Sequence, residues 1–244
     1  MAEWSGVKEK SQNGKTLNLM AKDGVILTSG GFGANVAMRQ KYDTLWNKTL
    51  DEKVKTTNLP SITGDGINMA QRLGAATVDM GYIQLLPTTD PYTGATNHKV
   101  AEGTCIYVNK DGNRFVNELE RRDVLAKAVG INAENLKKTV ASWNEFCKVQ
   151  KGDKFGRSTC LREHLLDEGP YWATIMTPSV HHTMGGLKIN SKTQVMNVDG
   201  KPIEGLYAAG EITGGIHGTN RVGCNAVPDT LVFRRIAGTE VGLK

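Results

Sequence analysis

Residues 179–227 include the segments SVHHTMGGLKIN and GLYAAGEITGGIHGTNRVGCNAV. The apolar run Leu206–Ala209 predicts a short buried strand that ends in Gly210-Glu211. A strand that leads through a glycine-rich turn into a helix is where α/β folds bind their ligands. The pair Gly185-Gly186 lets the backbone approach a ligand closely, because glycine has no Cβ. This stretch therefore predicts an α/β fold with a ligand site at the turn.

Side chains suited to an anionic ligand flank this turn in the sequence. His181 and His182 precede it, and Arg221 follows it. A guanidinium group binds a carboxylate in a bidentate geometry that lysine cannot copy. We interpret these residues as a site for an anionic substrate. The alternative is that the two adjacent histidines form a packed pair whose polar atoms bind the backbone.

The same stretch resembles the soluble flavoprotein fumarate reductase family, which includes urocanate reductases and related FAD-dependent enoate reductases. The family signature runs HHTMGG, GLYAAGE, TGG, HG, NR and GGNA, and this sequence matches nearly all of it in order. The resemblance implies an α/β (α+β) fold, a partial FAD-binding Rossmann-like domain with an inserted, shortened capping domain. The flavin domain would comprise residues 1–81 and 179–244, and the capping (clamp) domain residues 82–178.

The resemblance also implies roles for particular residues. It assigns His182 and Arg221 to the carboxylates of an unsaturated substrate and Arg122 to protonation of an alkene carbon. Cys224 stands where the family has a glycine that leaves room for substrate, so it is expected to narrow the pocket. Contacts to FAD are implied for Gly30, Gly31, Asp65, His181, Glu211, Ala226 and Val227.

For two of these assignments, the local sequence pattern makes a prediction that does not depend on the resemblance. Spacing alone makes Asp65 the N-cap of a helix over residues 67–73, whereas the resemblance makes it a flavin contact. Ala226 and Val227 begin the last predicted helix, and its N-terminal amides would face the flavin pyrimidine carbonyls.

The sequence departs from the family pattern in three places. Leu86 replaces a substrate-facing histidine, and Asn97–Ala101 replaces a Thr-Glu-Ala-Val-Arg segment. Several strands and helices of the family's cap are missing after Ala126. With Cys224, these changes favour a second candidate substrate beside fumarate, namely another enoate such as urocanate.

Periodicity and capping signals predict several elements directly. Alternation predicts a strand over Thr16–Met20, an apolar run predicts a strand over Val25–Leu27, and a Lys-Asp-Gly-Asn turn predicts a hairpin over residues 106–116. Asn132 is expected to cap a helix over Ala133–Val149, whose apolar stripe packs in a core.

The phosphate-binding turn of FAD enzymes, Gly-x-Gly-x-x-Gly, does not occur in these 244 residues. The ADP half of FAD would then lack its binding unit, and the sheet would have an exposed edge. Two alternatives follow. The chain is a catalytically silent or truncated remnant of the family, or a partner chain supplies the missing half of the FAD site.

Composition limits the other possibilities. The net charge is +5 with scattered Lys and Arg and 6% aromatic residues, which does not indicate a nucleic-acid site. A mild positive field could steer a small dicarboxylate or serve solubility alone. No apolar run reaches the roughly 20 residues of a membrane span, and no secretory h-region is visible, so a cytoplasmic location is expected. Four cysteines without a CxxC pair predict reduced thiols and no metal site. Nothing in the sequence indicates the electron donor.

Overall fold

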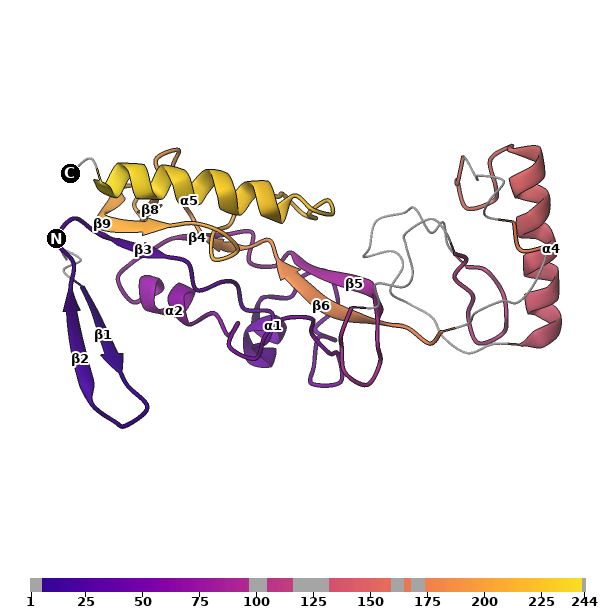
Figure 1. Cartoon of the computed structure of the whole chain (residues 1–244), viewed down its shortest axis with the longest axis horizontal. Helices are drawn as coiled ribbons and strands as arrows, with labels where there is room; N and C mark the ends of the chain where they lie inside the picture. Colours follow the sequence, from indigo (N-terminus) through magenta and orange to yellow (C-terminus); the bar gives the residue numbers. More distant parts are fainter. Residues whose placement is uncertain (1–5, 97–104, 116–131, 159–164, 168–173, 243–244) are drawn as a thin grey trace. The chain divides into compact units, whose positions relative to one another are not determined.

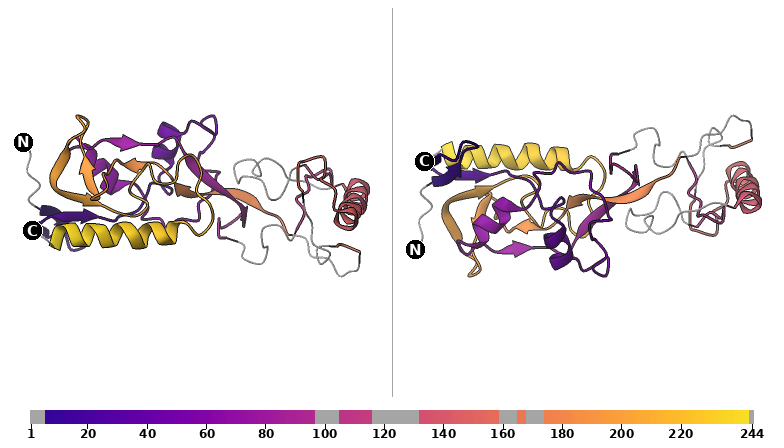
Figure 2. Two further views of the ribbon diagram at one scale, coloured as in Figure 1. Left: turned by 90° about the horizontal axis from the view of Figure 1, so that it is seen from above. Right: turned by 90° about the horizontal axis from the view of Figure 1, so that it is seen from below.

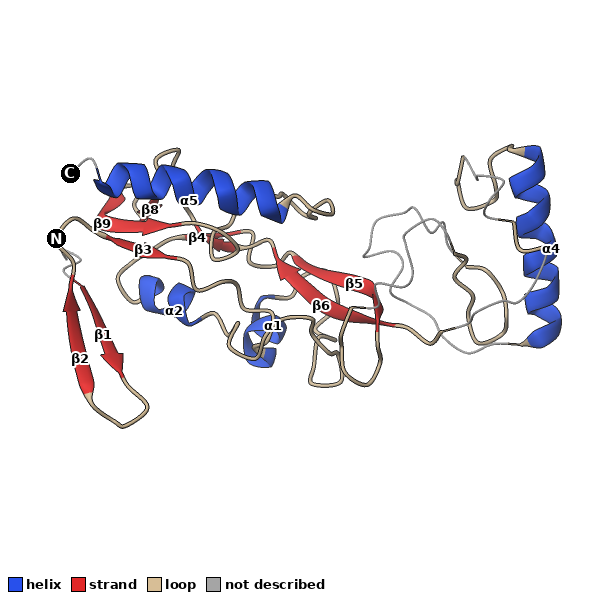
Figure 3. Ribbon diagram, in the orientation of Figure 1, coloured by secondary structure: helices blue, strands red, loops and turns tan. Residues whose placement is uncertain are grey.

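The structure is a computed structural model that describes residues 6–96, 105–115, 132–158, 165–167 and 174–242 (Figures 1 and 3). It mixes helices and short strands, which confirms the α/β class. The strands are β1 (Gly6–Lys10), β2 (Thr16–Met20), β3 (Val25–Leu27), β4 (Thr77–Val78), β5 (Ile83–Thr89), β6 (Thr177–Thr183), β7 (Gly186–Leu187), β8 (Gln194–Met196) and β9 (Pro202–Ala208), and the helices are α1 (Val36–Tyr42), α2 (Asp65–Gln71), α4 (Ala133–Val149) and α5 (Ala226–Gly242).

The chain forms two compact units. The first contains Met1–Val54, Asn58–Gln84 and His181–Lys244, and the second contains Lys55–Thr57 and Leu85–Val180. Strands β5 and β6 pair with each other and carry the chain between the two units. Every residue of the candidate site described below belongs to the first unit.

A three-stranded sheet of order β3-β9-β8 organises the first unit. Strand β3 runs parallel to β9, and β8 runs antiparallel to it. Helix α5 covers one face of this sheet (Figure 2), where Tyr207 and Ala209 pack against Ala237 and Phe233. Strands β2 and β3 lie where the sequence predicts them, and α5 begins at Ala226 as expected.

Helix α2 lies on the other side of the sheet from α5 (Figure 1). A Cβ on Gly66 would stand against the Ser29 hydroxyl and 2.7 Å from Cδ1 of Ile212, so this helix needs glycine to approach the sheet. The prediction that Asp65 is the N-cap is wrong. The cap is Gly64 with φ 80°, and Asp65 is the exposed first residue of the helix.

The second unit has its own core around α4. The side chain of Asn132 caps this helix by accepting hydrogen bonds from the amides of Glu134 and Asn135, as predicted. Trp143 and Phe146 bury the apolar stripe. In the predicted hairpin, the described residues form a single antiparallel bridge between Val108 and Arg114, and Val116 lies outside them.

The expectation of reduced thiols is wrong for one cysteine. Cys224 is a free thiol, but Cys147 is disulfide-bonded. In the described part of the chain, no helix has the length and apolarity that a membrane span requires.

Candidate functional site

The parallel pairing of β3 and β9 brings two glycine turns together. Val25 lies opposite Leu206, and Leu27 lies opposite Ala208, so both strands end at the same edge of the sheet. The turn that contains Gly31 follows β3, and the turn that contains Glu211 follows β9. A Cβ added to Gly31 would collide with Oγ1 of Thr183 and stand 2.6 Å from Oε1 of Glu211. Only glycine therefore lets these two turns touch.

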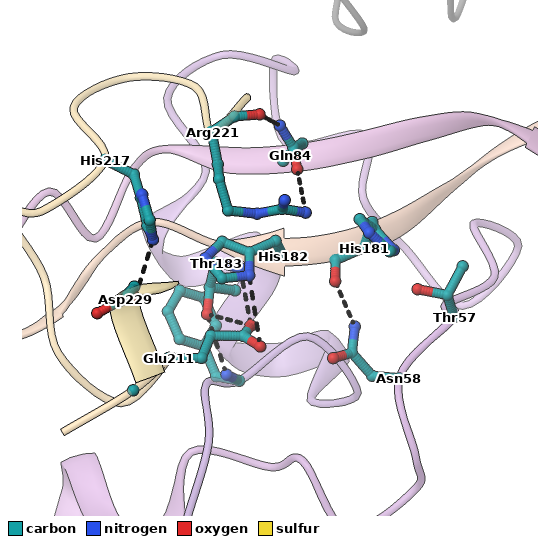
Figure 4. Close-up of polar contacts among 12 residues, drawn as sticks. Thr57, Asn58, Gln84, His181, His182, Thr183, Glu211, His217, Arg221 and Asp229 are labelled. Carbon is teal, nitrogen blue, oxygen red and sulfur yellow. Dashed lines mark hydrogen bonds and ion pairs between the residues drawn. The ribbon is translucent and has the colours of Figure 1, made fainter. Parts of the chain in front are cut away.

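Glu211 is the centre of a polar cluster (Figure 4). Its Oε1 atom accepts hydrogen bonds from the backbone amide of Thr183 at 3.0 Å and from the Thr183 hydroxyl at 3.2 Å. Burial raises the pKa of Glu211, although these hydrogen bonds and the charge of Arg221 act in the opposite direction. The carboxylate is thus held in one orientation at the C-terminal ends of the parallel strands β3 and β9.

His182 lies on β6 next to this carboxylate. Its Nδ1 atom is 3.5 Å from Oε2 of Glu211, which would be an ion pair only if the imidazole were protonated. Burial, followed by the charges of Arg221, His217 and His181, lowers the pKa of His182 to about 3. We therefore treat the contact at neutral pH as a polar contact of a neutral imidazole.

Arg221 is buried, and Gln84 fixes its position. The Nη2 atom of Arg221 donates to Oε1 of Gln84 at 3.1 Å, and Nε2 of Gln84 donates to the backbone oxygen of Arg221 at 2.7 Å and to the side chain of Asn220. Gln84 is a site residue that was not predicted from the sequence. The sequence does contain one clue to its role, which is an amide side chain in β5, a strand that is buried at every position.

The structure brings His182, Arg221 and Glu211 together, and the other predicted residues have varied surroundings. His181 is half-buried, and its backbone oxygen accepts a hydrogen bond from Asn58 at 3.3 Å. Gly30 has φ 82° and faces Ile62. Asp65, Cys224 and Val227 are exposed, and Ala226 is half-buried. Arg122 and the departing segment 97–101 lie outside the described residues.

Comparison with known proteins decides the family. A model described as "FAD binding domain" matches residues 4–133 and 128–227. The chain belongs to this FAD-binding family.

Relatives within the FAD-binding family include reductases of unsaturated carboxylates. The chain is 37% identical to the NADH:acrylate oxidoreductase of Vibrio harveyi, over 96% of this chain and 28% of the relative. It is 38% identical to the urocanate reductase of Eggerthella lenta, over 92% of this chain and 45% of the relative. The chain thus spans less than half of these relatives. The first alignment covers 284 residues whereas this chain has 244, so that relative carries residues inside the aligned span that this chain lacks.

Solved structures agree with the FAD-binding family. The open conformation of a flavocytochrome c3 fumarate reductase superposes with a TM-score of 0.74 at 31% identity. This match covers 99% of the present chain and 50% of the fumarate reductase chain. The Rossmann-like flavoprotein fold implied by the sequence resemblance is therefore confirmed, for about half of the neighbour's chain.

The residues of the first unit fit one half of FAD. Parallel strands ending in glycine turns, an oriented Glu211 acceptor and the N-terminus of α5 suit the ribityl chain and flavin ring of that cofactor. The pyrophosphate half has no counterpart, because the Gly-x-Gly-x-x-Gly turn does not occur in residues 1–244.

The neutral state of His182 predicts a loss of stability in acid. Since the folded-state pKa is below the ordinary value of 6.5, the unfolded chain binds the proton more tightly. The stabilising contribution is therefore complete above pH 6.5 and is lost as the pH falls toward about 3. We expect His182→Gln to remove a slope of about 1.4 kcal/mol per pH unit from the free energy of unfolding. Urea titrations at several pH values measure this slope.

Glu211→Gln is the control, because it should change the pH dependence of the free energy of unfolding in the opposite direction. A raised carboxyl pKa means that the folded state binds the proton more tightly, so stability is lost as the pH rises from the ordinary value of 4.5 through the raised one. Replacing Glu211 should therefore remove a slope of the other sign. Equal pH slopes in the wild type and His182→Gln would contradict the assignment of a neutral, buried His182.

Cys224 has a backbone conformation that favours glycine. Its φ is 68°, in the left-handed region that L residues seldom adopt, and its side chain is exposed. We expect Cys224→Gly to raise the free energy of unfolding by about 0.5–1 kcal/mol, because strain is released and no buried contact is lost. Cys224→Ala keeps the Cβ, so it should leave the free energy of unfolding unchanged in the same denaturation experiment. A stabilising Cys224→Ala would show that the thiol, and not the backbone, is the cause.

Proposed function

We propose that this chain forms the substrate-binding part of an FAD-dependent reductase of α,β-unsaturated carboxylates, of the fumarate-to-succinate type. The observation that carries the proposal is the convergence of His182 from β6 with Glu211 and Arg221 from the loop between β9 and α5 onto one buried cluster. FAD, when bound, would supply the hydride for the alkene. The residues of this chain then have to bind the substrate, orient it and provide a proton.

Arg221 and His182 bind the substrate carboxylate in this proposal. A guanidinium can bind a carboxylate in a bidentate manner, and Gln84 restricts its rotation. Negative charge that develops on the substrate during reduction is stabilised by the same fixed donors. Arg122 provides the proton to the second alkene carbon, and Cys224 narrows the pocket; these two roles rest on the sequence resemblance alone.

We further propose that residues 82–178 form a shortened capping domain and that another polypeptide segment supplies the phosphate-binding half of the FAD site. Two features of the first unit favour such a segment. In the described part of the chain, β3 pairs on one side only and is an edge of its sheet. Helix α5 also presents Val227, Leu231 and Val232 to solvent, each about half exposed or more. Edge strands and exposed apolar patches are typical of surfaces that another segment covers.

Reconstitution tests the proposal. The 244-residue chain is purified alone and together with a polypeptide that carries the Gly-x-Gly-x-x-Gly half of a related reductase. We expect the mixture to bind FAD and turn yellow, and to oxidise a reduced viologen when fumarate, urocanate or acrylate is added. An FAD-loaded mixture that reduces none of the three would contradict the proposal.

A second candidate is a catalytically silent remnant of the family that acts as a binding or structural module. The absence of the phosphate-binding turn from residues 1–244 favours it. The same experiment separates the two candidates, because a silent remnant would take up no FAD even with the complementary segment present.

A further inference from the structure

His217 and Asp229 form a buried pair beside the site that neither the sequence analysis nor the proposed function uses. The Nε2 atom of His217 lies 3.0 Å from Oδ2 of Asp229, and the side chains are 11% and 5% exposed. His217 comes from the loop that follows Glu211, and Asp229 comes from the first turn of α5.

The geometry of this pair fixes the orientation of the His217 ring. An ionised carboxylate can only accept hydrogen bonds, so Nε2 of His217 carries the hydrogen. The second oxygen of Asp229, Oδ1, is buried and has no hydrogen-bond partner among the described residues. Burial of such an oxygen is costly. Among the described residues, His217 is therefore the single side chain that binds this carboxylate.

The oriented ring contacts His182. The two imidazole rings meet edge to face, with centroids 5.4 Å apart and an interplanar angle of 73° (Figure 4). A continuous row thus leads from Asp229 through His217 and His182 to Glu211. The charged or titratable groups that face His182 are Glu211 after β9, His217 and Arg221 in the following loop, Asp229 behind His217 on α5, and His181 on its own strand.

We propose that His217 and Asp229 are a positioning pair, in which Asp229 orients His217 and the His217 ring holds the His182 imidazole aligned for the substrate carboxylate. The inference rests on the proposed function for the identity of the substrate. Its physical core is the coupling between the two imidazoles, which exists in this chain whether or not a cofactor is bound. The charge of His217 is one of the causes that lower the pKa of His182.

Nuclear magnetic resonance of the chain labelled with ¹³C and ¹⁵N at histidine tests the coupling directly. The chain has five histidines, so each ring can be assigned with a His→Gln variant. In His217→Gln we expect the protonated fraction of His182 at about pH 5 to rise about tenfold, which corresponds to one pKa unit. In Asp229→Asn the His217 ring should lose its single Nε2–H tautomer, and the His182 ring signals should move.

Glu240→Gln is the matched control. Glu240 is a carboxylate on the same helix, and it pairs with Lys192 at 3.4 Å, away from the histidines. This variant should leave the His182 and His217 signals unchanged. If Asp229→Asn does not fold, His217→Gln still gives the readout, because its amide can donate to Asp229. Unchanged His182 signals in every folded variant would overturn the inference.

A kinetic arm separates this inference from the proposed function. In the FAD-loaded assembly, Asp229→Asn should raise KM for the unsaturated carboxylate about tenfold and lower kcat less, because substrate alignment is lost. Coupled histidine signals without any enoate reduction would support the positioning pair and count against the proposed function. Enoate reduction with uncoupled histidine signals would support the proposed function and overturn the positioning pair.

Discussion

Gly31→Ala is expected to lower the free energy of unfolding by about 3 kcal/mol, because overpacking at a rigid contact forces the backbone to shift. The added methyl group would collide with the Thr183 hydroxyl and stand 2.6 Å from Glu211 Oε1. Both atoms are already tied to each other by a 3.2 Å hydrogen bond, so neither can move without breaking it. Urea denaturation followed by circular dichroism measures the change.

Gly238→Ala is the matched control for this prediction. Gly238 lies in α5, and a Cβ there has no heavy atom within 4 Å. Because alanine has a higher helix propensity than glycine, we expect this substitution to stabilise the chain by about 0.5–1 kcal/mol. The two Gly→Ala changes should therefore differ in sign. A Gly31→Ala variant as stable as the wild type would show that the turns after β3 and β9 are not in contact.

Arg221→Lys is expected to lower kcat/KM for an unsaturated carboxylate by about 10²–10³-fold in the FAD-loaded assembly. Lysine keeps the charge but cannot bind Gln84 and a carboxylate with one planar group. Steady-state oxidation of a reduced viologen measures the loss.

Arg72→Lys is the control, since Arg72 is exposed at the C-terminal end of α2. It should change kcat/KM by less than about threefold, because exposed substitutions away from a site have small effects. If Arg221→Lys were as active as Arg72→Lys, the substrate would be bound by other residues.

Local sequence signals determined several parts of this protein. Two-residue alternation predicts β2, an apolar run predicts β3, and the Asn132 cap with its apolar stripe predicts α4. The ordered glycine, histidine and arginine motifs predict the family. These features depend on residues within a few positions of one another, so periodicity and capping are enough to predict them.

Contacts between distant segments could be decided only by the tertiary structure. Gln84 and Arg221 are 137 residues apart, and no local pattern relates them. The parallel register of β3 and β9 decides that Gly31 touches Glu211, and the packing of α5 decides that Asp229 reaches His217. The φ of Cys224 likewise follows from the loop that the surrounding fold imposes. The sequence determines which ionisable side chains the protein has. The packing of strands and helices decides which of these side chains are buried together, and therefore which pKa values shift.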